Sequence, residues 1–202
     1  MLPASLFIDR AACAYTSCYC EENVYLMSHR LRDRYPFVEQ FVVFVSNPAA
    51  SVAIWEQCKA SAPGSAVVWD YHVILLVLPG PDSNAAVYDL DTSLDGFPVP
   101  AVEYVNASFL PTDTVPDVYR PYFRVVAGDV FRSTFASDRS HMLGGDGEWL
   151  APPPGYPPIS SPSSTNNLDA WRTLDALSVH VDPSASPLTG YGEVMTLARF
   201  QD

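Results

Sequence analysis

The segment Val67–Leu78, which reads VVWDYHVILLVL, carries the strongest strand signal in the chain and decides the fold. Because side chains alternate along a strand, Asp70, His72, Ile74 and Leu76 are expected on one face and the residues between them on the other. Both faces are largely apolar, which predicts a strand covered on both sides. His72 is an ionisable residue within this strand, and such conflicts concentrate at functional sites. A hydrogen-bonded core histidine is the competing interpretation.

A hairpin is predicted next, because Pro79–Asn84 (PGPDSN) is rich in turn-forming residues and leads into a second strand, Ala85–Asp91 (AAVYDLD). If residues 78 and 85 pair across the loop, residue i faces residue 163 − i. His72 then lies opposite Asp91, with Asp89 one diagonal step away on the same face. A register shifted by two places Asp89 directly opposite. The spacing therefore predicts an acid beside His72 without choosing between the two aspartates, which alternatively cap the loop that follows.

A helix is predicted from Cys18 to about Arg34, with Thr16 and Ser17 as capping residues. Glutamates lie in its first turns and arginines near its end, as the helix dipole favours. Cys20 heads a core-facing stripe at helical spacing. The stripe continues with Val24, Met27 and Leu31. Because a helix N-terminus stabilises a thiolate, Cys20 is the candidate nucleophile, and a small buried hydrophobe is the alternative interpretation.

The remaining segments complete a small α+β domain. Further strands are expected at Phe41–Ser46, Val52–Cys58, Tyr122–Ala127 and Glu193–Phe200. Residues 1–14 are expected to form a loose lead-in, and residues 151–165 a Pro- and Ser-rich loop. Asn167 is expected to cap a short helix, Leu168–Leu177. One helix packed on mostly antiparallel strands predicts the α+β class, and a chain of 202 residues fits a single domain, 1–202.

The composition disfavours several classes of partner. With 11 Lys and Arg against 23 Asp and Glu, the net charge of −12 argues against nucleic acid and against an anionic membrane surface. No segment is long and apolar enough to cross a bilayer, and the first residues lack the pattern of a signal peptide. Without a secretion signal, we expect reduced thiols in a cytoplasmic protein. A monomer is also expected, and the nucleus is a second expected location. The thiols are Cys13, Cys18, Cys20 and Cys58.

Cys at a helix start, His on a strand and Asp on the next strand are the three parts of a thiol triad. The cysteine attacks a carbonyl, the imidazole moves the proton, and the carboxylate holds the imidazole tautomer. Papain-like and transglutaminase-like enzymes have the same chain order, so the pattern predicts acyl-transfer chemistry on an amide. No metal or other cofactor is expected, because the pair Cys18 and Cys20 lacks the second ligand pair of the usual zinc patterns.

Five blocks of sequence resemble, in order, those of the protein N-terminal glutamine amidohydrolase family, from about Ala12 to Phe200. They are Tyr15–Asn23 (YTSCYCEEN), Trp69–His72 (WDYH), Tyr88–Thr92 (YDLDT), Phe135–Met142 (FASDRSHM) and Pro152–Pro157 (PPPGYP). The resemblance implies a papain-like or transglutaminase-like fold, no metal, and a place in the N-degron pathway. It also implies that N-terminal glutamine of proteins or peptides is deamidated to glutamate with release of ammonia. The implied catalytic residues are Cys20, His72 and Asp89. The chain departs from the family between blocks, where residues 106–116 and 160–187 are rich in Pro and Ser.

An enzyme for N-terminal glutamine must recognise the free α-ammonium group, which internal glutamine lacks. Four groups near the implied triad are candidates for this role: Glu21, Asp70, Ser137 and Asp138. Helix N-terminal charge for Glu21 and structural hydrogen bonds for the others are the competing interpretations. Two other functions remain open. One is a thiol amidase or transglutaminase-like acyl transferase of different specificity, and the other is a catalytically dead module that binds N-terminal peptides.

Overall fold

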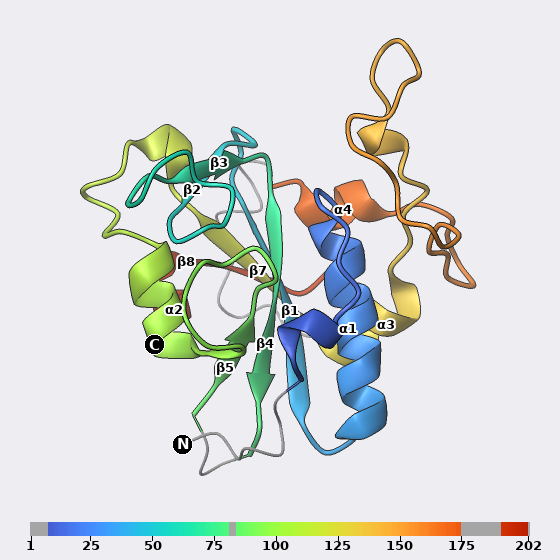
Figure 1. The fold of residues 1–202 in the computed structure, drawn as a ribbon, viewed down its shortest axis with the longest axis horizontal. Coiled ribbons are helices and arrows are strands. Elements are labelled where there is room, and N and C mark those ends of the chain that lie inside the picture. Colours follow the sequence, from blue (N-terminus) through green and yellow to red (C-terminus); the bar gives the residue numbers. More distant parts are fainter. Residues whose placement is uncertain (1–7, 81–83, 175–190, 202) are drawn as a thin grey trace.

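The computed structural model describes residues 8–80, 84–174 and 191–201, and a six-stranded sheet lies at its centre (Figure 1). The strand order is β6-β5-β4-β1-β7-β8, and every neighbouring pair is antiparallel. The strands are β1 (Glu39–Ser46), β4 (His72–Leu78), β5 (Ala86–Tyr88), β6 (Val99–Pro100), β7 (Tyr122–Ala127) and β8 (Glu193–Thr196). The α+β class and the mostly antiparallel sheet are confirmed.

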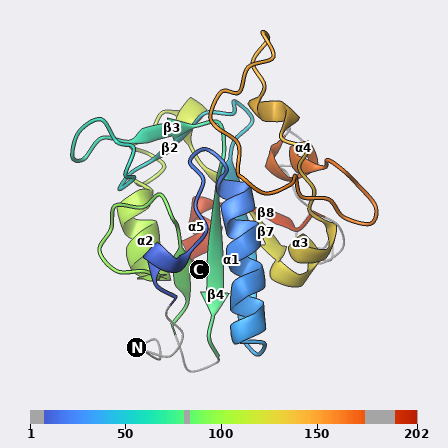
Figure 2. The same cartoon turned by 45° about the vertical axis from the view of Figure 1, so that its right-hand side comes forward.

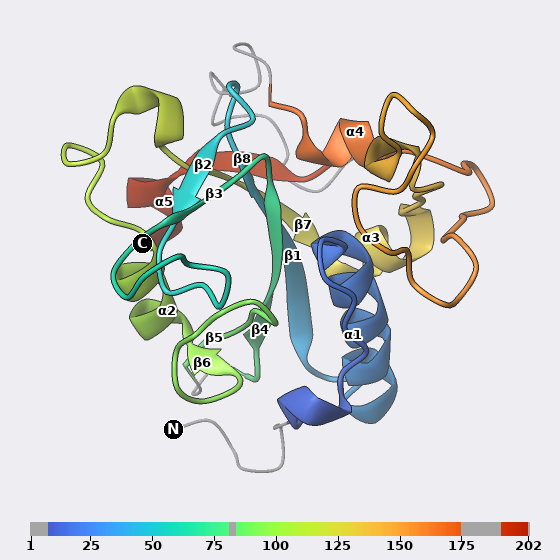
Figure 3. The same ribbon diagram turned by 45° about the horizontal axis from the view of Figure 1, so that its top comes forward.

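Helices cover both faces of this sheet (Figures 2 and 3). One apolar core joins the sheet to α1 (Cys20–Arg34), α3 (Gly128–Thr134) and α4 (Leu168–Arg172). The other joins it to α2 (Ala101–Ser108) and α5 (Leu197–Gln201). Alternation along β1 serves both cores, because Val42 and Phe44 belong to the first and Val43 and Val45 to the second. The apolar runs of the sequence are therefore those of a sheet covered on both sides.

The strand predicted over residues 67–78 is wrong as one continuous element. Val67–Trp69 forms β3, which pairs with β2 (Val52–Ile54) in a separate two-stranded sheet, and β4 begins only at His72. Between them, the Asp70 carboxylate accepts the backbone N–H of Tyr71 at 3.0 Å, a local bond that competes with strand pairing. The break also overturns the predicted alternation. The Trp69 ring stacks on the His72 ring, with 5.2 Å between centroids.

Of the two hairpin registers that the sequence leaves open, the structure has the one in which residue i faces residue 163 − i. Leu75 pairs with Tyr88, Leu76 with Val87 and Val77 with Ala86, so each pair sums to 163. The ladder ends at Tyr88, three residues before the end predicted for that strand. Asp89 and Asp91 therefore lie just past the ladder, beside the first residues of β4.

The α1 helix begins at Cys20 instead of Cys18, and Thr16 and Ser17 are not its caps. Tyr19 is the N-cap residue and makes no side-chain capping bond. Thr16 instead exchanges two hydrogen bonds with the Asn23 side chain, at 2.8 and 2.9 Å, which hold the approach to the helix. The core-facing stripe is confirmed, because Val24, Met27 and Leu31 are buried and Cys20 packs against the same core.

Several other boundaries differ from the prediction. The strand predicted at residues 52–58 ends at Ile54. The strand predicted at residues 193–200 turns into α5 at Leu197, whose side chain reaches the second core. The short helix predicted from residue 168 to 177, α4, ends at Arg172, and residues 175–190 lie outside the described part of the chain. The strands predicted at 41–46 and 122–127 are confirmed, whereas α2, α3 and β6 were not predicted.

Two further predictions concern the N-terminal lead-in and the absence of a membrane-spanning segment. Of the predicted lead-in, residues 1–7 lie outside the described part, while Ile8 is buried in the first core. No helix in the described part of the chain has the length and hydropathy to cross a membrane.

Candidate active site

Cys20 is the first residue of α1, and its sulfur meets the start of β4. The backbone N–H of Val73 donates a hydrogen bond to the Cys20 sulfur. This N–H is available because β5 pairs with β4 only from Leu75 onward. The end of the hairpin ladder thus leaves room for the thiol next to Val73, whose preceding residue is His72.

His72 and Asp89 form a buried pair beside that position. His72 Nε2 lies 2.9 Å from Asp89 Oδ1, and both side chains are almost fully buried. The other ring nitrogen, Nδ1, is buried and has no hydrogen-bond partner among the described residues. The stacked Trp69 ring holds the plane of the imidazole. The arrangement presents one anchored nitrogen and one free nitrogen, as a proton-transferring histidine requires.

Four hydrogen bonds fix the Asp89 carboxylate. Oδ1 accepts from His72 and from the Asp91 backbone N–H, both at 2.9 Å. Oδ2 accepts from the Gln57 amide at 3.0 Å and from the Tyr104 hydroxyl at 2.8 Å. Asp91 Oδ1 instead accepts from the hydroxyl of Tyr15, in the segment before α1, at 2.6 Å. Asp89 is therefore the acid that holds the His72 ring.

The pKa values follow from this geometry. Burial by itself lowers the pKa of His72, but the Asp89 carboxylate outweighs it, so the pKa is raised. Burial by itself raises the pKa of Asp89, yet His72 and the other donors hold it at about 2. Burial raises the pKa of the Cys20 thiol well above its ordinary value, and the acids Glu21 and Asp91 add to the effect. The free protein therefore holds Cys20 as a thiol beside an ionised aspartate.

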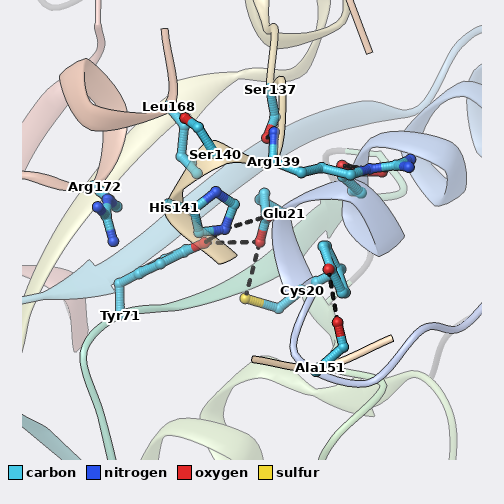
Figure 4. Close-up of polar contacts among 12 residues, drawn as sticks. Cys20, Glu21, Tyr71, Ser137, Arg139, Ser140, His141, Ala151, Leu168 and Arg172 are labelled. Carbon is cyan, nitrogen blue, oxygen red and sulfur yellow. Dashed lines mark hydrogen bonds and ion pairs between the residues drawn. The ribbon is translucent and has the colours of Figure 1, made fainter. Parts of the chain in front are cut away.

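A second polar cluster lies beside the Cys20 thiol (Figure 4). Glu21 is fully buried, and its Oε2 accepts from the Tyr71 hydroxyl at 2.9 Å and lies 3.6 Å from the Cys20 sulfur. His141 Nε2 lies 3.7 Å from Glu21 Oε1 and 3.4 Å from the Tyr71 oxygen. Burial raises the pKa of Glu21 to about 7. Burial and the nearby Arg172 lower the pKa of His141.

The Pro-rich loop closes over this end of α1. The Tyr19 hydroxyl donates to the Ala151 carbonyl at 3.1 Å (Figure 4). Arg139 and Glu22 form a buried bidentate pair with both distances at 2.8 Å, and the Arg139 guanidinium lies over the Tyr156 ring. Arg139 also donates to the Pro154 carbonyl at 3.2 Å, so the Glu22–Arg139 pair links the first turn of the helix to the Pro-rich loop.

The four residues predicted to bind substrate occupy different places. Glu21 contacts the Cys20 sulfur. Asp70 is exposed and lies 3.5 Å from Arg172, because the strand break turns it away from His72. Ser137 is buried and accepts the Arg139 backbone N–H at 3.3 Å. Asp138 is exposed and accepts from the Ser140 backbone N–H at 2.9 Å and from the Asn166 side-chain amide at 2.8 Å.

Several polar residues around the site were not predicted from the sequence. Tyr104 and Gln57 come from outside the matching blocks and left no signal that sequence analysis could use. Tyr71 and His141 belong to the blocks WDYH and FASDRSHM, which the sequence analysis had already linked to the site. Their meeting at Glu21 depends on packing between distant segments.

His72, Asp89 and Asp91 each place one potential ligand atom within 4.8 Å of the others, which makes them a candidate metal group. Their donors do not fit a metal site. Both Asp89 oxygens and Asp91 Oδ1 are already engaged in hydrogen bonds, and the His72 nitrogen on this side is bound to Asp89. Cys18 and Cys20 do not share a helix face either, because Cys18 precedes α1 with a φ of +70°.

These features define an α+β protein with a cysteine at a helix N-terminus beside a buried histidine–aspartate pair. The family model described as N-terminal glutamine amidase matches residues 15–202, and the chain belongs to this family. It is 40% identical to a protein N-terminal glutamine amidohydrolase of Homo sapiens, over 95% of this chain and 87% of that protein. The protein of the same name from Danio rerio is 41% identical over 93% and 87%. That from Drosophila willistoni is 39% identical over 85% and 83%.

Proposed function

We propose that this protein hydrolyses the side-chain amide of an N-terminal glutamine, releasing ammonia and leaving N-terminal glutamate, through a Cys20–His72–Asp89 triad. The buried Nε2–Oδ1 bond of 2.9 Å, with Nδ1 left free, is the observation that supports this mechanism most strongly. Family membership and the names of the relatives support the substrate. On this proposal the fold is of the papain-like or transglutaminase-like kind, and the reaction serves the N-degron pathway.

The first half of the reaction forms a thioester. His72 Nδ1 takes the Cys20 proton as the sulfur attacks the side-chain amide carbon, because the thiol rests protonated in its buried position. The backbone N–H of Cys20, the first residue of α1, is the proposed donor to the oxygen on which negative charge develops. His72 then gives its proton to the departing nitrogen, and ammonia leaves.

The second half hydrolyses the thioester. His72, neutral again, takes a proton from water, and the hydroxide adds to the thioester carbon. The carbon–sulfur bond breaks, the proton returns to sulfur, and glutamate is released. Asp89 keeps its charge throughout and holds the imidazole in the required tautomer. The balance is one amide plus water to one carboxylic acid plus ammonia.

The test incubates the full-length protein with a Gln-initiated peptide and measures the deamidated mass and the ammonia released. Cys20→Ala should abolish turnover, and Cys18→Ala, the matched control two residues away, should keep it. Full activity of the Cys20 variant would refute the mechanism. The same assay includes acetyl-Gln, internal-Gln and Asn-initiated peptides. Asn should fail because its amide carbon lies one methylene short of the sulfur.

The substrate panel also separates the competing functions. Comparable turnover of the acetylated or internal peptide would assign the protein to general thiol amidases. Transfer of the acyl group to an added amine in preference to water would assign it to acyl transferases. Peptide binding without ammonia release, together with a Cys20 that resists alkylation at neutral pH, would indicate a dead binding module.

A further inference from the structure

Glu21 is a buried acid that the triad mechanism does not use. Its carboxylate is fully buried, and Oε2 is occupied by the Tyr71 hydroxyl. Oε1 is buried without a hydrogen-bond donor among the described residues. Leaving a buried carboxylate oxygen without a donor costs free energy, so such atoms usually serve a ligand or a proton. This one lies on the residue next to the nucleophile.

Resting on the function proposed above, we propose that Glu21 Oε1 and His141 Nε2 together receive the α-ammonium group of the substrate. Their separation of 3.7 Å lets a single nitrogen sit within hydrogen-bond distance of both. An ammonium carries three N–H donors, and the two atoms offer it two acceptors. The site would then distinguish a free chain N-terminus from an acylated one.

The position suits the length of a glutaminyl residue. Four covalent bonds separate its α-nitrogen from its side-chain amide carbon, which is about 5 Å at full extension. The reacting carbon must come within about 3–3.5 Å of the sulfur. The Glu21 carboxylate begins 3.6 Å from that sulfur, so nitrogen and carbon can reach their partners together.

No positively charged side chain among its described neighbours neutralises Glu21, so its carboxylate can pair with the cationic group of a substrate. Burial and Arg172 lower the pKa of His141, so its ring is neutral near pH 7 and Nε2 can accept. Arg172 itself lies over the Tyr71 ring and is paired with Asp169, away from Glu21. The neighbouring acid of α1, Glu22, is paired with a cation of its own.

The cation that pairs with Glu22 is Arg139, which is bound through both carboxylate oxygens of that residue. Tyr71 and the Cys20 thiol, the other titratable groups in contact with Glu21, are uncharged because burial raises both of their pKa values. Glu21 is therefore an acid without a cation of its own. An acylated N-terminus would leave it unpaired, and a site built for a polar group strongly rejects an analogue that lacks it.

The test compares a Gln-initiated peptide with its des-amino analogue, in which hydrogen replaces the α-ammonium group. The wild type should prefer the Gln peptide by about 10³-fold or more in kcat/KM. Glu21→Gln should reduce this preference to within about tenfold, and His141→Phe should reduce it in part. Glu103→Gln removes an exposed charge from α2 and serves as the control, with the preference unchanged.

Binding is measured separately by protection of Cys20 from iodoacetamide, which needs no turnover. The Gln peptide should protect the wild type at far lower concentration than the des-amino peptide, and Glu21→Gln should remove that difference. A protein that shows this protection but releases no ammonia would refute the proposed function and leave the receptor standing. Unchanged discrimination in both the Glu21 and the His141 variants would overturn the receptor while leaving the triad intact.

Discussion

Replacing Glu21 by Gln should stabilise the protein, and the gain should grow with pH. The side chain is fully buried, and burial raises its pKa from 4.5 to about 7. Between these two pH values the folded protein binds more protons at this site than the unfolded chain. Stability therefore falls as pH rises through this window, and the loss is complete above about pH 7.

The magnitude follows from the two pKa values. A difference between 4.5 and about 7 costs the folded state roughly 3 kcal/mol at pH 8 and about 1 kcal/mol at pH 5. Glutamine has the shape of the protonated acid and does not ionise, so it avoids this cost. Any constant difference in hydrogen bonding to Tyr71 affects both pH values equally. The advantage of Glu21→Gln should thus increase by about 2 kcal/mol between pH 5 and pH 8.

Urea unfolding at pH 5 and pH 8 measures this change, and thermal unfolding should show a rise of roughly 4–8 °C in the advantage. Glu103→Gln is the control, because that side chain is exposed on α2 and its effect should stay nearly constant. A Glu21→Gln effect that is the same at both pH values would contradict the reasoning. So would a variant that is less stable at pH 8 than at pH 5, relative to the wild type.

Three further predictions test the Asp89 contacts of the site and the packing of the sheet. Asp89→Asn should lower kcat on the order of 10³–10⁴-fold and change its pH profile, whereas Asp91→Asn should lose far less; equal losses would show that the bond to His72 is not decisive. Tyr104→Phe removes a donor to the Asp89 carboxylate and should cost about 1–3 kcal/mol in urea unfolding, and no change would argue against that bond. Gly192→Ala should destabilise by roughly 2–4 kcal/mol, because φ is +77° and the added Cβ would clash with the carbonyl oxygen of Val125 in β7; a stable variant would mean that this segment relaxes freely.

Local sequence determined the parts of the site that depend on spacing alone. The turn after Leu78 and the two-residue period of the strands predicted the register that pairs Leu75 with Tyr88. The 3.6-residue period predicted the buried face of α1 and placed Cys20 at its head. Both are short-range patterns, in which one local choice sets the direction of the neighbouring side chains.

Tertiary structure decided what those patterns left open. Period and parity put two aspartates near His72, and only packing chose Asp89, because Gln57 and Tyr104 arrive from other segments to hold its second oxygen. The break at Asp70 likewise moved Trp69 onto the His72 ring, against the expected alternation.

The cluster around Glu21 is entirely a product of the fold. Its members come from α1, from the residue before β4 and from the loop that contains His141, which are separated by many residues in the chain. No periodicity links such segments. Burial, which raises the pKa of Glu21 to about 7, exists only once they have packed together. The sequence by itself determined which chemical groups were available near the nucleophile, and the tertiary structure decided which of them meet, because desolvation and long-range contact are properties of the folded state alone.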